Sequence, residues 1–543
     1  MPAEGNALEG STVRKLIPTI VFVAVLLPGF HVRGQTSGEL LNQAVEAYNA
    51  DSLAQAAKLF YEVKMTDPQA ANRAQAEYYL GQSLFKMGMY QSALAFYNAV
   101  FVAGPAHPYY LKGTEGLVRV AEALKDDTLI PSQINKYYNS QEFANMDPMV
   151  LSRINFYVGL LLYRQEKYGE SMAFLSAIDA ESAVYAKGLF LQAIIHIRLG
   201  VRYNLARDEA RTKAEYNKAI ELFGTILDLS GHERVKAEEA IDRYDNIVRL
   251  WQLCTLNLAR AYYGKGDFAK AIMYYARVPR FSQDWADALF EMSWAFFMRE
   301  EYGKALGALH TLHSPRFAKL FSPESWILKA TIYFHVCLYE EAKGSLGYFS
   351  EHFEKLLPDL KKLLDENLPN EQFASLLLKD KLEKTDPMAR VPDTIRLSIL
   401  NSPRVENFRH FLRSLEAEAV AIDQVSEWKG TRLREELAGV VAVQRNLLVR
   451  TAGGFVKANL FNRYQTVLGF VGHAKLVKLE ITTRERQLLK AGLDIKAERR
   501  GKLAPRPDVP DETYNYWPFR KEYWRDELGF YEYTVRRACP ENR

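Results

Sequence analysis

The sequence predicts an all-α fold in which pairs of helices stack one after another into a solenoid. Three observations predict it: a frame of small and aromatic residues recurs through the first two thirds of the chain, apolar residues within each copy follow helical spacing, and strand patterns are scarce. The composition is globular, with 48% hydrophobic and 25% charged residues. That balance excludes collagen-like, low-complexity and wholly disordered chains.

The clearest copy of the frame occupies residues 78–105. A small residue is followed by large apolar residues, and a second small residue lies where a second helix would cross the first. In this copy the positions are Gly81, Leu84, Tyr90, Ala93, Tyr97 and Val100, and five further copies begin at Ala44, Gly159, Ala259, Ser293 and Ala330. Small residues let two helices cross closely, while the apolar stripe needs a neighbouring pair to cover it.

This frame resembles the tetratricopeptide (TPR) repeat, a helix–turn–helix unit of 34 residues. The resemblance covers residues 38–353 and implies about eight repeats in a right-handed superhelix that binds protein partners. Two copies are degenerate. Residues 109–145 have a weak second helix, and a copy around Ile195 and Ala219 carries an insertion between its helices at residues 198–215.

In a TPR superhelix the first helix of each repeat lines the concave face. The position expected to point inward is aromatic in six copies, which would form a ladder that anchors a partner. The alternative is that each ring packs on the adjacent helix and serves only the core. These candidate partner-binding residues are Tyr48, Phe85, Tyr163, Tyr263, Phe297 and Phe334.

The N-terminal residues 1–34 have the pattern of a secretory signal peptide. Arg14 and Lys15 precede an apolar run of twelve residues, Leu16 to Leu27, and cleavage is expected before Gln35. The run is shorter than the roughly 20 residues that span a bilayer. An uncleaved N-terminal anchor is the alternative. We therefore expect an exported, periplasmic protein, with outer-membrane association left open.

Three cysteines in 543 residues exclude a disulfide scaffold. Cys254 and Cys337 fall in predicted helices two repeats apart, so both are expected to be small core residues. Cys539 lies in the C-terminal tail and is the candidate for a bond to another chain.

After residue 353 the repeat frame ends, and residues 354–500 form a helical region of a different kind. Ser402 and Pro403 are expected to begin a long amphipathic helix that pairs with the segment 433–449 as a hairpin. The pair Gly453-Gly454 is expected to break the helix. Residues 484–506 carry a net charge of +5, which indicates a solvated helix end or a contact with anionic lipid or peptidoglycan.

Residues 501–543 comprise a proline-rich linker and an aromatic tail. So many aromatic residues mark a contact surface, and the tail is expected either to dock on its own repeats or to capture a partner. The residues expected to dock are Tyr516, Trp517, Phe519, Tyr523 and Trp524.

A narrower resemblance rests on three segments: WADALFEMSWAFFMREEYGKALGALHTLHSPRF, SWILKATIYFHVCLYEEA and YWPFRKEYWRDELGFY. They are similar to exported TPR proteins of deltaproteobacteria, a group that includes a TPR protein associated with the adventurous gliding machinery of myxobacteria. The resemblance implies a cell-envelope scaffold that mediates protein–protein interactions during assembly of a motility or surface complex. The alternative is a periplasmic chaperone or cell-wall-enzyme activator that helps outer-membrane or peptidoglycan assembly.

Catalytic motifs are missing from the sequence: it has no HExxH, CxxC, GxxxxGK[ST] or GxSxG pattern. Adjacent Asp526 and Glu527 would point about 100° apart on a helix and make a poor acid–base pair. The net charge of +4 is too small to indicate nucleic acid. We therefore expect no enzyme activity, no catalytic residue, no metal, no cofactor and no small-molecule substrate. A wall-lytic activity in the C-terminal helices remains an outside alternative.

Overall fold

The computed structural model describes residues 37–127, 129–236, 241–379, 381–491, 519–535 and 539. Helices make up the regular structure in these ranges, and none of them contains a strand. The chain divides into two compact units, each built from two separate stretches of sequence. The first unit contains residues 1–195 and 407–448, and the second contains residues 196–406 and 449–543.

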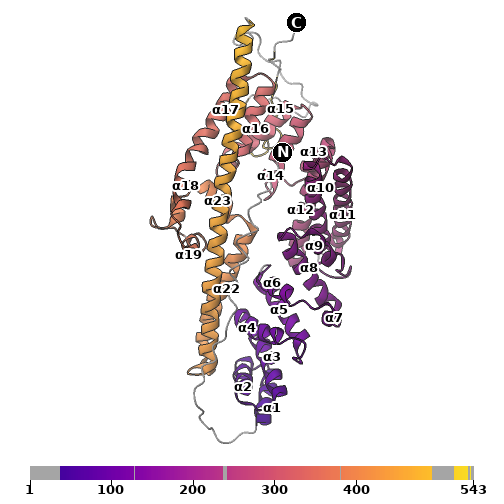
Figure 1. Ribbon diagram of the computed structural model, residues 1–543, viewed down its shortest axis with the longest axis vertical. Coiled ribbons are helices and arrows are strands. Elements are labelled where there is room, and N and C mark those ends of the chain that lie inside the picture. The colour runs from indigo at the N-terminus through magenta and orange to yellow at the C-terminus, as the bar shows by residue number, and fades with distance from the viewer. Residues whose placement is uncertain are drawn as a thin grey trace. The chain divides into compact units, whose positions relative to one another are not determined.

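The first unit begins with helices that follow one another as antiparallel pairs (Figure 1). The pairs α1–α2, α3–α4 and α8–α9 are regular, whereas α5 is followed by two short helices where one second helix would stand. The helices are α1 (Ser37–Asn49), α2 (Leu53–Thr66), α3 (Ala70–Lys86), α4 (Tyr90–Val102), α5 (Tyr110–Leu124), α6 (Leu129–Lys136), α7 (Ser140–Phe143), α8 (Pro148–Arg164) and α9 (Tyr168–Ser176). The short α6 and α7 agree with the weak second helix expected in residues 109–145.

The second unit continues the same arrangement. Three regular pairs, α12–α13, α14–α15 and α16–α17, are followed by short helices. The bounds are α11 (Glu209–Lys236), α12 (Ile241–Lys265), α13 (Phe268–Tyr275), α14 (Trp285–Met298), α15 (Tyr302–Leu312), α16 (Pro323–His335), α17 (Tyr339–His352), α18 (Leu357–Asp365), α19 (Asn370–Phe373), α20 (Ser375–Leu378) and α21 (Asp393–Leu400). Helix α10 (Tyr185–Leu205) contributes residues to both units.

The small residues of the repeated frame lie where two helices cross. Their side chains are fully buried because the two helices of a pair are in close contact there. Larger residues at these positions would force the helices apart. An added Cβ at Gly81, for example, would meet the ring of Tyr97 at 3.0 Å. The fully buried frame residues are Ala44, Ala56, Ala93, Ser171, Ala259, Ala271, Ser293, Ala305, Ala330 and Ala342. The all-α, helical-repeat fold predicted from the sequence is confirmed.

The expected insertion at residues 198–215 is not a loop. Helix α10 runs on to Leu205 and α11 begins at Glu209, so the additional residues lengthen two helices. Tyr216 of α11 fills the space beside Gly200, whose added Cβ would lie 3.0 Å from the ring. The prediction that an inserted segment separates the two helices was wrong. Residues 198–215 contain no proline and keep helical spacing, so they extend the helices on either side.

Two long helices follow the repeats: α22 (Pro403–Gln424) and α23 (Arg432–Lys490). Helix α22 begins at Pro403 after Ser402, as expected. Ion pairs from Arg434 to Asp423 (2.8 Å) and from Arg445 to Glu416 (4.0 Å) join α22 to the first part of α23. Since the paired positions run in opposite directions, the expected antiparallel hairpin is confirmed.

The helix break predicted at Gly453-Gly454 is wrong, because α23 continues through both residues. An added Cβ at Gly453 would lie 1.9 Å from the carbonyl oxygen of Asn370. The glycines therefore allow the backbone of α19 to approach the helix closely. Close approach of another backbone is a reason for a glycine inside a helix, besides a helix end.

The C-terminal helices pack on the repeats of their own unit. In the first unit the fully buried Trp428 donates Nε1–H to the carbonyl of Ala54 (2.9 Å). Glu418 accepts hydrogen bonds from the amides of Gln91 (2.8 Å) and Ser92 (2.7 Å) at the start of α4. In the second unit Val467, Val471, Ile481 and Leu488 join the core of the α14–α17 repeats. The domain boundaries predicted from the sequence at residues 354 and 500 mark changes of sequence pattern. The compact units of the structure follow a different division, because each combines segments from both sides of residue 354.

Candidate protein-binding surfaces

Within each unit the first helices of successive pairs contact one another. Helix α1 contacts α3, and α3 contacts α5 in the first unit; α12 contacts α14, and α14 contacts α16 in the second. One face of each stack is therefore built from first helices, which is the face on which the sequence places the aromatic ladder.

The six ladder residues lie near the C-terminal ends of first helices and are half-buried. In five of them the ring meets an aromatic ring five residues later, at the start of the second helix of the same pair. The ring-centroid distances are 5.3 Å for Phe85–Tyr90, 6.0 Å for Tyr163–Tyr168, 5.2 Å for Tyr263–Phe268, 5.9 Å for Phe297–Tyr302 and 6.0 Å for Phe334–Tyr339.

Tyr48 is the exception among the ladder residues, because Leu53 occupies the position five residues later. Its ring contacts Tyr79 of the next first helix at 5.3 Å, and Lys86 lies over the ring at 4.2 Å. The ladder rings thus hold the turn of each pair together while part of each ring stays exposed. Their role in binding a partner remains a prediction.

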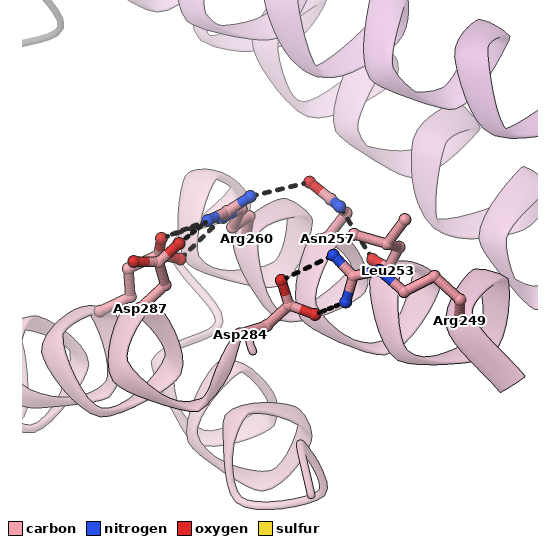
Figure 2. A network of polar contacts seen from close by, with 7 residues as sticks. Arg249, Leu253, Asn257, Arg260, Asp284 and Asp287 are labelled. Atoms are coloured by element: carbon pink, nitrogen blue, oxygen red, sulfur yellow. Dashed lines mark hydrogen bonds and ion pairs between the residues drawn. The ribbon is translucent and has the colours of Figure 1, made fainter. Parts of the chain in front are cut away.

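Between α12 and α14 a polar network joins two successive first helices (Figure 2). Arg249 pairs with Asp284 through two contacts, one of which is Nη2 to Oδ1 at 3.1 Å. Arg260 donates from Nε (2.8 Å to Oε2) and from Nη2 (2.6 Å to Oε1) to Glu291. Bidentate arginine–carboxylate pairs fix the register of the two helices.

The outer part of this network is accessible. Asp287 lies 3.9 Å from Arg260 and its side chain is 65% exposed, whereas that of Glu291 is 11% exposed. Burial, with smaller contributions from the nearby Glu324 and Glu291 carboxylates, raises the pKa of Tyr263 to about 12. The Tyr263 hydroxyl therefore keeps its proton and can donate a hydrogen bond from this face.

The aromatic tail lies on the α14–α16 repeats of its own unit. The amide of Tyr533 donates to the carbonyl of Gly303 (3.1 Å), and the amide of Gly529 donates to Oγ1 of Thr311 (3.0 Å). Arg280 Nη2 donates to the carbonyls of Arg525 (2.8 Å) and Asp526 (2.9 Å). Backbone groups of the tail thus take part in each of these hydrogen bonds.

Two glycines of α15 make room for the tail backbone. An added Cβ at Gly307 would lie 1.7 Å from the carbonyl oxygen of Tyr531, and one at Gly303 would lie 2.3 Å from that of Tyr533. A side chain at either position would occupy the path of the tail. The pair of glycines four residues apart was the sequence signal that could have located this site.

His310 lies at the centre of the docked tail. Its ring contacts Phe519 (4.5 Å), Tyr523 (5.1 Å) and Tyr531 (4.7 Å), and its Nδ1 lies 2.9 Å from the hydroxyl of Tyr533. Burial, with a smaller contribution from the charge of Lys329, lowers the pKa of His310 to about 4. The imidazole is therefore neutral at pH 7, and its Nδ1 shares a hydrogen bond with the Tyr533 hydroxyl.

The predicted docking residues have different positions. Phe519 and Tyr523 contact His310, as above, but Trp524 is 56% exposed. Tyr516 and Trp517 lie outside the described residues, as does the signal segment 1–34. The predicted docking set left out Leu528, which is buried, and the tail aromatics Tyr531 and Tyr533, which are partly buried against the repeats.

The cysteines differ from the expectation. Cys337, in the turn between α16 and α17, forms a disulfide with Cys539, so it is not a free core thiol and Cys539 is not available to another chain. Cys254 is buried and free, as expected. The disulfide was missed because it joins positions 202 residues apart that only tail docking brings together.

The basic stretch is described only in part. Within α23, Glu485 pairs with Lys343 of α17 at 2.8 Å, which ties the end of the helix to the repeats. Residues 492–506 lie outside the described ranges.

Across the described ranges, no group of three or more His, Cys, Asp or Glu residues is arranged to hold a metal ion. Nor does any helix in those ranges have the length and apolar character needed to cross a membrane.

Comparison with known proteins gives little further evidence. No protein-family model matches the chain, and no curated protein matches it. A solved structure, the apo form of RapI, is similar over 76% of this chain and 98% of its own, with 11% sequence identity and a TM-score of 0.30. That likeness is too weak to carry an argument about fold or function.

Proposed function

We propose that the chain is a non-enzymatic scaffold that holds protein partners together during assembly of a cell-envelope complex. One observation carries the proposal: in each unit, contacting first helices present half-buried aromatic rings along one face. Stacked helix pairs commonly bind protein segments on such a face. Half-exposed Tyr and Phe rings supply a large contact area at low entropy cost.

The proposal of a non-enzymatic role is supported by how the polar groups of this face are used. Glu291 and Asp284 are each paired with an arginine across two helices. Such pairing stabilises the charged carboxylate and suits a fixed packing contact better than proton transfer.

The envelope location rests on the N-terminal pattern, and the link to gliding motility rests on the resemblance of three segments. Mass spectrometry of the protein from its native cells tests the location. A mature N-terminus at Gln35 supports export, whereas an intact residue 1–34 segment in a cytoplasmic fraction contradicts it.

Crosslinking in intact cells followed by purification of the full chain tests the scaffold itself. A small set of envelope proteins in fixed stoichiometry supports the proposal. A broad set of unfolded barrel proteins would instead favour the chaperone alternative, and release of muropeptides by the pure protein would favour an enzyme.

A pair of charge reversals then tests the proposed face. Asp287→Lys changes an exposed carboxylate on first helix α14, while Glu351→Lys makes the same change on second helix α17. We expect the first variant to lower recovery of the crosslinked set about tenfold and the second to leave it unchanged. Equal recovery from both variants would refute the assignment of the first-helix face.

A further inference from the structure

A cationic cavity lies between the docked tail and the turn that follows α15. Its volume is about 360 Å³, and its lining includes Ser314 and Arg316 from the turn and Lys521, Tyr523, Arg525 and Leu528 from the tail. All of these residues belong to the second unit. A cavity of this size is within the usual range for small-ligand sites.

Among the described residues, the three cations of the cavity have no carboxylate partner. No carboxylate is among the lining residues, and neither Arg316, Lys521 nor Arg525 forms an ion pair with another described residue. The described acidic residues of the tail lie outside the lining, and Glu527, for example, accepts a hydrogen bond from the hydroxyl of Tyr531 (3.2 Å). Three positive charges that have no ion-pair partner within the described part of the chain favour an anion in the space between them.

An aromatic ring holds the two guanidinium groups in place. Arg316 lies 4.6 Å and Arg525 lies 5.0 Å from the ring centre of Phe281. Arg280 fixes the backbone beside them, because it donates to the carbonyls of Arg525 and Asp526. Stacking on a ring orients a guanidinium without using its N–H donors, which stay available for the oxygens of a ligand.

A buried serine forms part of the cavity wall. Ser314 is 1% exposed, and its Oγ has no hydrogen-bond partner among the residues that the structure describes. Ser314 therefore belongs to the wall of the cavity, and the three cations carry the argument for a ligand.

We propose that Arg316, Lys521 and Arg525 form a binding site for a phosphate group. Phosphate fits because it carries up to two negative charges and several acceptor oxygens, which two guanidinium forks and an ammonium group can share. The phosphate comes either from a soluble phosphomonoester or from the headgroup of an anionic lipid. Because the tail supplies two of the three cations, the site exists only when the tail is docked.

Titration calorimetry on the full chain tests the site with two probes: glycerol 3-phosphate, and phosphatidylcholine vesicles containing 20% phosphatidylglycerol against pure phosphatidylcholine vesicles. The double variant Arg316→Gln/Arg525→Gln should weaken binding of the active probe at least tenfold. Arg277→Gln is the matched control, because that arginine also lies over a ring (Tyr274, 5.0 Å) but away from the cavity.

Lys521→Gln keeps the test valid if the double variant loosens the tail. Among the described residues, the Lys521 side chain makes no contact with the repeats that holds the tail in place. Replacing Lys521 should therefore leave the tail docked and weaken phosphate binding severalfold. Hydrogen exchange of the Gly529 amide reports docking in every variant. Failure of both probes to bind the wild-type chain, or equal binding by wild type, Lys521→Gln and the double variant, would overturn the proposal.

Discussion

Gly307→Ala should release the tail without unfolding the repeats. The new Cβ would lie 1.7 Å from the carbonyl oxygen of Tyr531, and real contacts are longer than 3.0 Å, so the tail backbone must move away. Overpacking of this kind costs about 1–3 kcal/mol, and here the cost falls on the docked state alone. A cost of about 2 kcal/mol makes the released tail about 30-fold more populated.

Gly347→Ala in α17 is the matched control, because nothing lies within 4 Å of its added Cβ. Both substitutions raise helix propensity by up to about 1 kcal/mol, so a lower melting temperature is not expected from either. Hydrogen exchange of the Gly529 and Tyr533 amides should become about 30-fold faster in Gly307→Ala only.

A second readout of tail release is the pKa of His310, measured by NMR of labelled histidine. In the docked state burial holds this pKa at about 4, and release should move it toward the ordinary value of 6.5. Wild-type exchange rates together with an unchanged His310 pKa in Gly307→Ala would refute the reasoning.

Further predictions concern the other contacts. Gly453→Ala should lower the free energy of unfolding by about 1–3 kcal/mol because the α19 backbone lies against it. Gly469→Ala, with open space around its Cβ, should raise it slightly, and urea denaturation compares the two. Glu418→Ala should cost about 1–3 kcal/mol, since it leaves two amides at the start of α4 unpaired; wild-type stability of this variant would contradict the contact. Trp428→Phe should cost about 1 kcal/mol through loss of its hydrogen bond to α2, measured in the same way. The docked tail binds fewer protons than the released tail because the pKa of His310 is lowered to about 4. The contribution of His310 to docking is therefore fully present above pH 6.5 and is lost as the pH falls toward 4, by about 1 kcal/mol per pH unit. Exchange of tail amides, corrected for intrinsic rates, that does not change between pH 7 and pH 5 would contradict this.

The repeat architecture could be predicted because its signal is local. A small residue such as Ala93 or Ala305 recurs at a fixed distance from aromatic and aliphatic residues in the same helix pair, and each copy repeats the same packing problem. The start of α22 at Pro403 and the hairpin with α23 could be predicted for the same reason, since caps and apolar stripes act within a few turns.

The glycine pairs show where local reasoning stops. Gly453 and Gly307 look alike as helix interruptions in the sequence, yet both lie inside continuous helices and admit a distant backbone. Whether a glycine ends a helix or receives another segment depends on what lies beside it, and that is decided by chain segments many residues away.

By itself the sequence determined that helix pairs would form and stack. A single amphipathic pair leaves an apolar face exposed to water, and stacking on the next pair buries that face. Only the tertiary structure decided that the tail returns to α15, that Cys337 meets Cys539, and that Arg316 meets Arg525 beside Phe281. These contacts join positions some 200 residues apart, and no periodic pattern links them. They depend on shape and backbone hydrogen bonds, which exist only once the repeats have folded.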